Sequence, residues 1–345
     1  MQFNISGDSF HTRCLSVGLF QSGPGHIRFR GDLFDLRKRG FIPMMGDFQS
    51  AGIIHQMEIT GEVSRASRRL EWVAGLQPHV AFEPSEESQG ECCRDPIDRL
   101  QGLVDERVDP HFPRALSREL GGPRACSHLL TLFQLIASAL LRTLGLEERA
   151  GWGPGVRSDG ERIAYRSLFV DGSGGEGALQ LTSSLSDVHT RPLRDVGEPA
   201  ERLALHDEVR VVCGVDLPSM SLAAIRAGER SRRLEPGTGG EWRDRTADVA
   251  GLKGLRLVSG VARQLIRRFE GRSGDGLLLD ALLNIAPGLV QVVVALADGS
   301  PSLEPGENPL PRVAATGGRP DSCYMWRAGS PLLQIREGGK SRSSE

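Results

Sequence analysis

The same set of landmarks occurs twice along this chain, in the same order and about 150 residues apart. The spacing within each pair stays between 150 and 153 residues. Chance matches would not keep so constant a spacing. A constant period of this kind is typical of a duplicated structural unit. The paired landmarks are Arg13 and Arg166, Asp35 and Asp187, His55 and His206, Gly102-Leu103 and Gly254-Leu255, and Gly121 and Gly271, the last before a leucine-rich helix.

The duplication predicts a division of the 345 residues into two domains of ordinary size. We expect a first copy over residues 1–150, a linker over 151–160 and a degenerate second copy over 161–298. Residues 299–345 are rich in Gly, Pro and Ser and are expected to form a largely unstructured tail, with at most a short strand near Cys323–Trp326.

Each copy shows strand-like alternation followed by helical spacing. The first copy predicts strands near 26–35, 52–63 and 69–76, then helices from about 96 to 120 and from 129 to 144. The second predicts strands near 163–170, 178–187, 203–215 and 222–230, then helices near 255–269 and 277–297. The predicted fold class is therefore α+β: in each copy a small antiparallel sheet is followed by helices packed on one face, and the two copies meet about a pseudo-twofold axis.

Composition and terminal sequence limit the function classes. A formal net charge of -2 gives no general attraction to nucleic acid, and the basic run Arg226–Arg233 resembles a solvated strand edge. The N-terminus lacks the features of a signal peptide, and the apolar stretch 129–144 is too short to span a membrane, so we expect a cytoplasmic protein. The six cysteines are then free thiols or metal ligands.

The common enzyme motifs are missing or out of context. Residues 172–177, "GSGGEG", satisfy a dinucleotide-binding pattern, but they lie between two predicted strands with no helix after them. We interpret this segment as a hairpin loop and expect no bound nucleotide. The chain also has no phosphate-binding loop, nucleophile elbow or H-E-x-x-H helix.

A set of metal-binding residue types lies at the ends of elements in the first copy. Imidazole, thiolate and carboxylate groups brought together from different elements can bind zinc or iron. We therefore predict one transition-metal ion in the first copy, for metal handling, cluster handling or metal-assisted chemistry. The predicted ligands are His55, Cys126, His128 and Cys92 or Cys93, with Cys93 preferred, and Asp35 as a further ligand or an orienting group.

Two other interpretations stay open. His55 and Cys126 can be ordinary core residues of a non-catalytic module that binds an unidentified protein partner. Alternatively, Cys126 at a helix N-terminus has a lowered pKa and acts as a nucleophile, with His55 or His128 as its base. In the second copy Gly276 and Leu278 stand where Cys126 and His128 are expected, so that copy is predicted to lack the site.

Three segments of the first copy resemble a known family. They are "LFDLRK" at 33–38, "IIHQMEITGEV" at 53–63 and "LGGPRACSHLLTL" at 120–132. Together they resemble the bacterial domain of unknown function numbered 2889, over roughly Arg13 to Leu144. The resemblance implies no established activity. The acidic insertion near 83–91 departs from the family pattern, so whether Cys92 or Cys93 is the family's loop cysteine stays open. The order of the candidate ligands is also similar to that in the iron-sulfur scaffold proteins of the NifU type, with His55 in place of their first cysteine.

Overall fold

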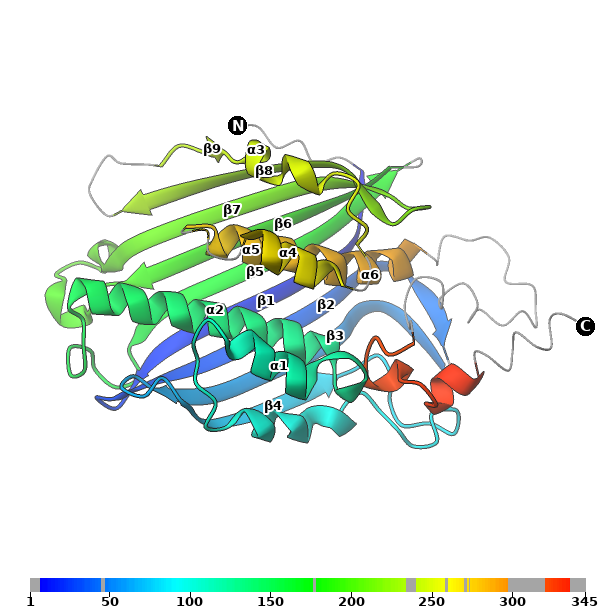
Figure 1. Ribbon diagram of the computed structural model, residues 1–345, viewed down its shortest axis with the longest axis horizontal. Helices are drawn as coiled ribbons and strands as arrows, with labels where there is room; N and C mark the ends of the chain where they lie inside the picture. The colour runs from blue at the N-terminus through cyan, green and yellow to red at the C-terminus, as the bar shows by residue number, and fades with distance from the viewer. Residues whose placement is uncertain are drawn as a thin grey trace, which may run out of the picture.

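The chain forms a single nine-stranded antiparallel sheet whose strands follow the order β4-β3-β2-β1-β5-β6-β7-β8-β9. The computed structural model describes residues 7–44, 47–175, 178–233, 240–257, 260–269, 272, 274–296 and 320–335. The helices lie across one face of the sheet (Figure 1). This arrangement confirms the predicted α+β class.

The first half is a meander of four long strands, β1 (Asp8–Ser22), β2 (His26–Met44), β3 (Asp47–Ser64) and β4 (Leu70–His79). Strands β2 and β3 are longer than the alternation predicted. Their pairing shifts register between Arg37 and Phe41, and this irregularity explains why the strict two-residue alternation does not continue to the end of β2.

The helical part of the first half has three main elements. The 3-10 helix η1 (Asp95–Leu103) occupies the predicted helical start near residue 96, α1 (Phe112–Leu120) ends at Gly121, and the short 3-10 turn η2 (Gly122–Arg124) leads into α2 (Ser127–Ala150). Helix α2 packs its buried leucines, Phe133 and Ile136 against the sheet. The wide apolar surface of α2 is typical of a helix that other elements contact from several sides.

The second half repeats the order of strands and then helices. Its strands are β5 (Arg162–Gly175), β6 (Ala178–Thr190), β7 (Leu203–Asp216), β8 (Ser221–Arg233) and the two-residue β9 (Arg243–Asp244). Short 3-10 segments, η3 (Leu193–Asp195) and η4 (Pro199–Arg202), precede β7, and α3 (Thr246–Val249), η5 (Ala250–Leu252) and α4 (Val261–Phe269) follow the strands.

The last predicted helix is divided into α5 (Gly276–Leu283) and α6 (Ile285–Leu296), and Asn284 separates them. The predicted start of the preceding helix at residue 255 was wrong, because Leu255 and Leu257 instead bond to Leu222 and Met220 beside β8. Gly271, Ala297 and residues 176–177 of the predicted hairpin loop lie outside the described residues.

The two halves join at the centre of the sheet, where β1 pairs with β5. Leu15 lies directly opposite Leu168, Arg13 lies opposite Val170, and Val17 lies opposite Arg166. This register is what a twofold axis between β1 and β5 would give, although the duplication itself stays a prediction. Buried residues of both halves form one continuous apolar core.

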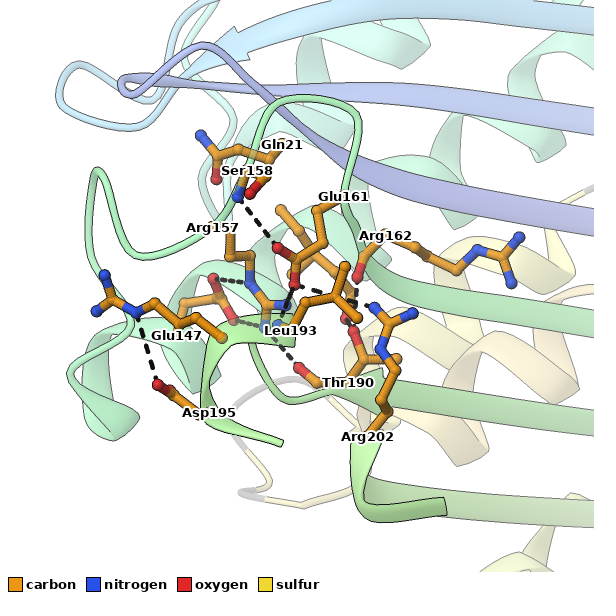
Figure 2. Close-up of polar contacts among 12 residues, drawn as sticks. Gln21, Glu147, Arg157, Ser158, Glu161, Arg162, Thr190, Leu193, Asp195 and Arg202 are labelled. Atoms are coloured by element: carbon orange, nitrogen blue, oxygen red, sulfur yellow. Dashed lines mark hydrogen bonds and ion pairs between the residues drawn. The ribbon is translucent and has the colours of Figure 1, made fainter. Parts of the chain in front are cut away.

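The predicted linker carries a buried ion-pair cluster. The Arg157 side chain is fully buried and donates to both carboxylate oxygens of Glu147, at 3.1 and 2.8 Å, and to Glu161 at 3.1 Å. It also donates to the backbone oxygen of Thr190, which ends β6 (Figure 2). Arg157 therefore ties the end of α2 to the first two strands of the second half.

Two helical stretches, Ser127–Ala150 and Gly276–Leu296, are long and apolar enough to cross a membrane. The apolar stretch 129–144 was predicted to be too short to span a membrane. This length was wrong, because α2 extends to 24 residues. More than half of each apolar window, 56% and 61%, is buried within the fold. Core helices of globular proteins pass the same test, so the length and composition of these helices are weak evidence for a membrane span.

Part of the predicted tail packs against the first half. The predicted strand near Cys323–Trp326 was wrong, because Tyr324–Trp326 form the 3-10 helix η7. Met325, Trp326, Leu332 and Leu333 are buried and pack against Phe82 and Cys93. Residues 297–319 and 336–345, where the remainder of the unstructured tail was predicted, lie outside the described residues.

Candidate metal centre

The candidate site is built around the fully buried carboxylate of Asp35 on β2. In the sheet, Asp35 lies directly opposite Arg13 on β1 and directly opposite His55 on β3. Directly opposed residues present their side chains on the same face. Here that places Arg13 Nη1 3.2 Å and His55 Nδ1 3.1 Å from Asp35 Oδ2.

Helix α2 contributes the fourth side chain. Cys126 precedes the helix in an extended conformation, and His128 lies in its first turn. The Nε2 atom of His128 is 3.2 Å from Asp35 Oδ2, and the His55 and His128 rings stack with centroids 4.0 Å apart. Asp35, His55 and His128 can each offer one atom to a common centre, with all three atoms within 4.8 Å of one another.

The spacing of these atoms is compatible with metal ligation as well as with hydrogen bonding. Ligands bound at about 2.0–2.1 Å are about 3.3–3.4 Å apart in a tetrahedral shell and about 2.9 Å apart at right angles. The observed distances from Asp35 Oδ2, 3.1 and 3.2 Å, lie between these values. Both histidines also stabilise the ionised form of Asp35 at these distances.

His128 has a polar contact at each ring nitrogen. Its Nε2 lies 3.2 Å from the amide nitrogen of Gln291 on α6, and this contact would have to open for Nε2 to bind an ion. Nδ1 faces Cys126 Sγ at 3.5 Å. A partner that orients the ring through its other nitrogen is a common feature of histidine ligands.

The charge of the site is balanced by Arg13. Burial alone would raise the pKa of Asp35, but the Arg13 charge and the contacts with His128 and His55 hold that pKa well below its usual range. Burial, and then the neighbouring His55, lower the pKa of His128 to about 3. At neutral pH the site therefore holds a carboxylate and a neutral His128 imidazole, which are the protonation states that metal binding requires.

The two predicted cysteine ligands lie to one side of this group. Cys126 contacts His128, while burial and then the neighbouring Cys126 and Cys323 raise the pKa of Cys93 well above its usual value. The lowered pKa expected for Cys126 was wrong, because burial raises it to about 12. A buried thiol that stays protonated at neutral pH is a weaker nucleophile than the thiolate predicted for Cys126.

Three residues near the site, His11, Gln291 and Cys323, were not predicted from the sequence. His11 lies on the same strand face as Arg13, with its Nε2 3.7 Å from Asp35 Oδ1. The two-residue alternation of His11, Arg13 and Leu15 was a signal that could have found it. Gln291 and Cys323 gave no such signal, because both come from segments that are distant in the sequence.

The second half contains a related cluster without an imidazole pair. Asp187 lies opposite Arg166 and opposite Asp207, so Asp207, rather than His206, occupies the position of His55. The predicted pairing of His206 with His55 was therefore wrong by one residue. A shift of one residue places a side chain on the opposite face of the sheet. Accordingly His206 faces Ser186, with His206 Nε2 2.9 Å from its hydroxyl oxygen.

An arginine lies between the carboxylates of this second cluster. Arg142 of α2 donates to Asp187 at 2.8 Å and also to Asp207. Arg166 donates to Asp187 and to Asp280 of α5, both at 2.8 Å. In the first half the neutral amide of Gln291 on α6 lies 3.2 Å from His128. Among the described residues, Arg13 is the arginine that pairs with Asp35.

Protonation of the buried histidines predicts acid lability in the metal-free protein. Burial lowers the pKa of His11 to about 4 and that of His128 to about 3 from 6.5, so the unfolded chain binds protons first as the pH falls below the unfolded value. Burial raises the pKa of Asp280 to about 6, and this opposes the trend because the folded state then binds a proton first. The stability lost through the two histidines is larger than the stability gained through Asp280. We therefore expect the free energy of unfolding to fall by about 3 kcal/mol between about pH 7 and about pH 4.5, and urea denaturation measures this change.

The comparison with known families covers the part of the chain that carries this site. Residues 11–142 match a family described as Protein of unknown function (DUF2889). The match confirms the resemblance predicted from the three sequence segments, and it begins at His11 and ends within α2. No curated protein and no solved structure matches the chain.

Proposed function

We propose that the protein binds one divalent transition-metal ion, zinc or iron, through Asp35 Oδ2, His55 Nδ1 and His128 Nε2. The observation that carries the proposal is the convergence of these residues: each offers one ligand atom, and all three atoms lie within 4.8 Å of one another.

The two halves differ in the groups that approach their buried carboxylates from the helix layer. In the second half Arg142 supplies a positive charge between Asp187 and Asp207. In the first half Arg13 of β1 pairs with the single carboxylate of Asp35, and His128 approaches it from α2 in place of an arginine. The first site therefore offers an ion a pair of imidazoles where the second half has a protein cation.

Two imidazoles and a carboxylate form a ligand set that suits zinc and ferrous iron and leaves coordination positions open. Cys126 would orient His128 rather than bind the ion, and Cys93 would lie farther out, beside Cys323. The site is largely buried, and the His128 side chain is 14% exposed against 0% for Asp35. This enclosure favours holding or handing on an ion over catalysis on a large substrate.

The test is the metal content of the full chain. Protein purified without chelators under anaerobic conditions is expected to contain about one equivalent of zinc or iron by elemental analysis. After chelation, it is expected to bind one equivalent of added Zn²⁺ tightly. The partly exposed group of His26, Glu62 and Glu71 is a possible weak competitor, so the His26→Gln variant should retain the tight equivalent. A protein that contains no metal and takes up none would contradict the proposal.

A further inference from the structure

A basic surface without acidic partners covers the segment from η5 to the end of α4. Between Asp248 and Glu270 the sequence has no acidic residue and five basic ones. All five are exposed, and none makes an ion pair with a residue that the structure describes. These five residues, which we call the α4 basic patch, are Lys253, Arg256, Arg263, Arg267 and Arg268.

The packing of α4 places two of these arginines side by side. The buried side of the helix is apolar and runs through Val261, Leu265 and Phe269. Arg263 and Arg267 lie four residues apart on the opposite side, so they are neighbours in solvent on the helix-bearing face of the sheet (Figure 1). Like charges at this spacing weaken a helix, so the pair does not serve the stability of α4.

Arg268 connects the end of α4 with η5. Its Nη1 is 3.5 Å from the backbone oxygen of Gly251, which lies two residues before Lys253. Arg256 follows η5, and its Nε is 3.3 Å from the backbone oxygen of Ser219. The end of the helix therefore lies beside η5, and the basic residues of the two elements form one surface.

The charges of this surface are not compensated within the described part of the chain. Other exposed arginines have carboxylate partners: Arg30 contacts Glu58 at 2.8 Å, and Arg118 contacts Glu106 at 2.8 Å. Asp248, which precedes the patch, is paired with Arg245. The α4 basic patch is therefore available to an external anion.

We infer that the α4 basic patch binds the phosphate backbone of duplex nucleic acid. Four of its five cations are arginines, whose planar guanidinium groups bind phosphate oxygens through paired hydrogen bonds. A duplex carries one negative charge per about 1.7 Å of its axis, so several of these cations release counterions at once. The net charge of -2, from which no attraction to nucleic acid was expected, does not oppose this local binding, because salt screens charges beyond about 8 Å. The inference goes beyond the proposed metal ion and does not depend on it.

Other anionic partners fit the patch less well. The large apolar side chains that are exposed among the described residues all lie outside residues 249–269. The patch therefore offers no apolar anchor to a membrane and no exposed aromatic ring on which single-stranded bases can stack. An acidic peptide carries at most one charge per about 3.3–3.6 Å of extended chain, which is about half the charge density of a duplex.

The test is the titration of labelled duplexes with the full chain, followed by fluorescence anisotropy. Mixed-sequence DNA and RNA duplexes of equal length are the two probes, and the one bound more tightly identifies the source of the phosphate. With about four phosphate contacts, the slope of log K against log salt is expected to be about -4 between about 50 and about 200 mM salt. A salt-independent affinity, or no binding to either duplex at about 50 mM salt, would overturn the inference.

Substitution locates the binding surface. Replacing both Arg263 and Arg267 with glutamine is expected to weaken duplex binding at least about 10-fold and to reduce the size of the salt slope by about 2. The double variant Arg30→Gln and Arg118→Gln is the matched control, because it changes the net charge by the same amount at exposed positions outside the patch. An equal loss in both double variants would overturn the inference and assign the binding to net charge. Wild-type binding to vesicles that contain phosphatidylserine, with none to the duplexes, would overturn it in favour of a membrane surface.

Discussion

Replacing His55 with alanine is expected to weaken Zn²⁺ binding by at least about 100-fold, because losing an orienting residue of a metal site already costs 10–100-fold. The substitution removes one of the three ligand atoms, and Asp35 and His128 alone leave the ion with only two protein bonds. Competition with a chromophoric chelator, monitored in solution, measures the change in Kd. Zinc affinity equal to that of the wild type would contradict the proposed ligand set.

His206→Ala is the matched control for this experiment. His206 occupies the position that the sequence repeat pairs with His55, yet in the sheet it faces Ser186 on the opposite side from Asp207. Its removal should leave zinc affinity unchanged. Because His55 is buried, the unfolding of both metal-free variants should be compared, and His55→Gln provides a substitution that leaves a smaller cavity.

Replacing Arg157 with methionine is expected to lower the free energy of unfolding by about 3–5 kcal/mol. Arg157 is the cation shared by Glu147 and Glu161, and its removal leaves two buried carboxylates with less compensation (Figure 2). Arg65 still contacts Glu147 at 3.3 Å, which keeps the expected loss within this range. Urea denaturation followed by circular dichroism measures the change.

Arg162→Met tests whether this loss is specific to the buried ion pairs. Arg162 begins β5 close to the same cluster, but its side chain is exposed (Figure 2). An exposed substitution of this kind typically changes stability by less than about 0.5 kcal/mol. If Arg157→Met and Arg162→Met destabilise the protein equally, the ion-pair cluster is not what joins α2 to the second half.

The strands were the most predictable part of the fold, because each has one buried face and therefore alternates. The predicted strands of the second half, for example, agree with β5 to β8 within a few residues at most ends. Helix boundaries were less predictable where tertiary contacts override local pattern. Asn284 interrupts one apolar run, and Leu255 and Leu257 bond beside β8 instead of starting a helix.

The candidate site was predictable to the extent that its residues lie at the ends of predicted elements. Asp35 and His55 on strands and His128 at the start of α2 were found in this way, and they come together around the Asp35 carboxylate. The positions of Cys93 and Cys126 relative to this group could not be predicted, since they depend on the loop between β4 and η1 and on the turn before α2. The approach of Gln291 and Cys323 depends on packing between segments more than 160 residues apart in the sequence.

The pairing of β1 with β5 constrains how the chain can be synthesised and folded. Ser22 ends β1 and Arg162 begins β5, so 140 residues must leave the ribosome before the central strand gains its second neighbour. Until then β1 has an open edge, which in a nascent chain is a template for pairing with other chains. Contacts between such distant segments also slow folding. Completion of the sheet is therefore a late event, and the interval before it is when this protein is most exposed to aggregation.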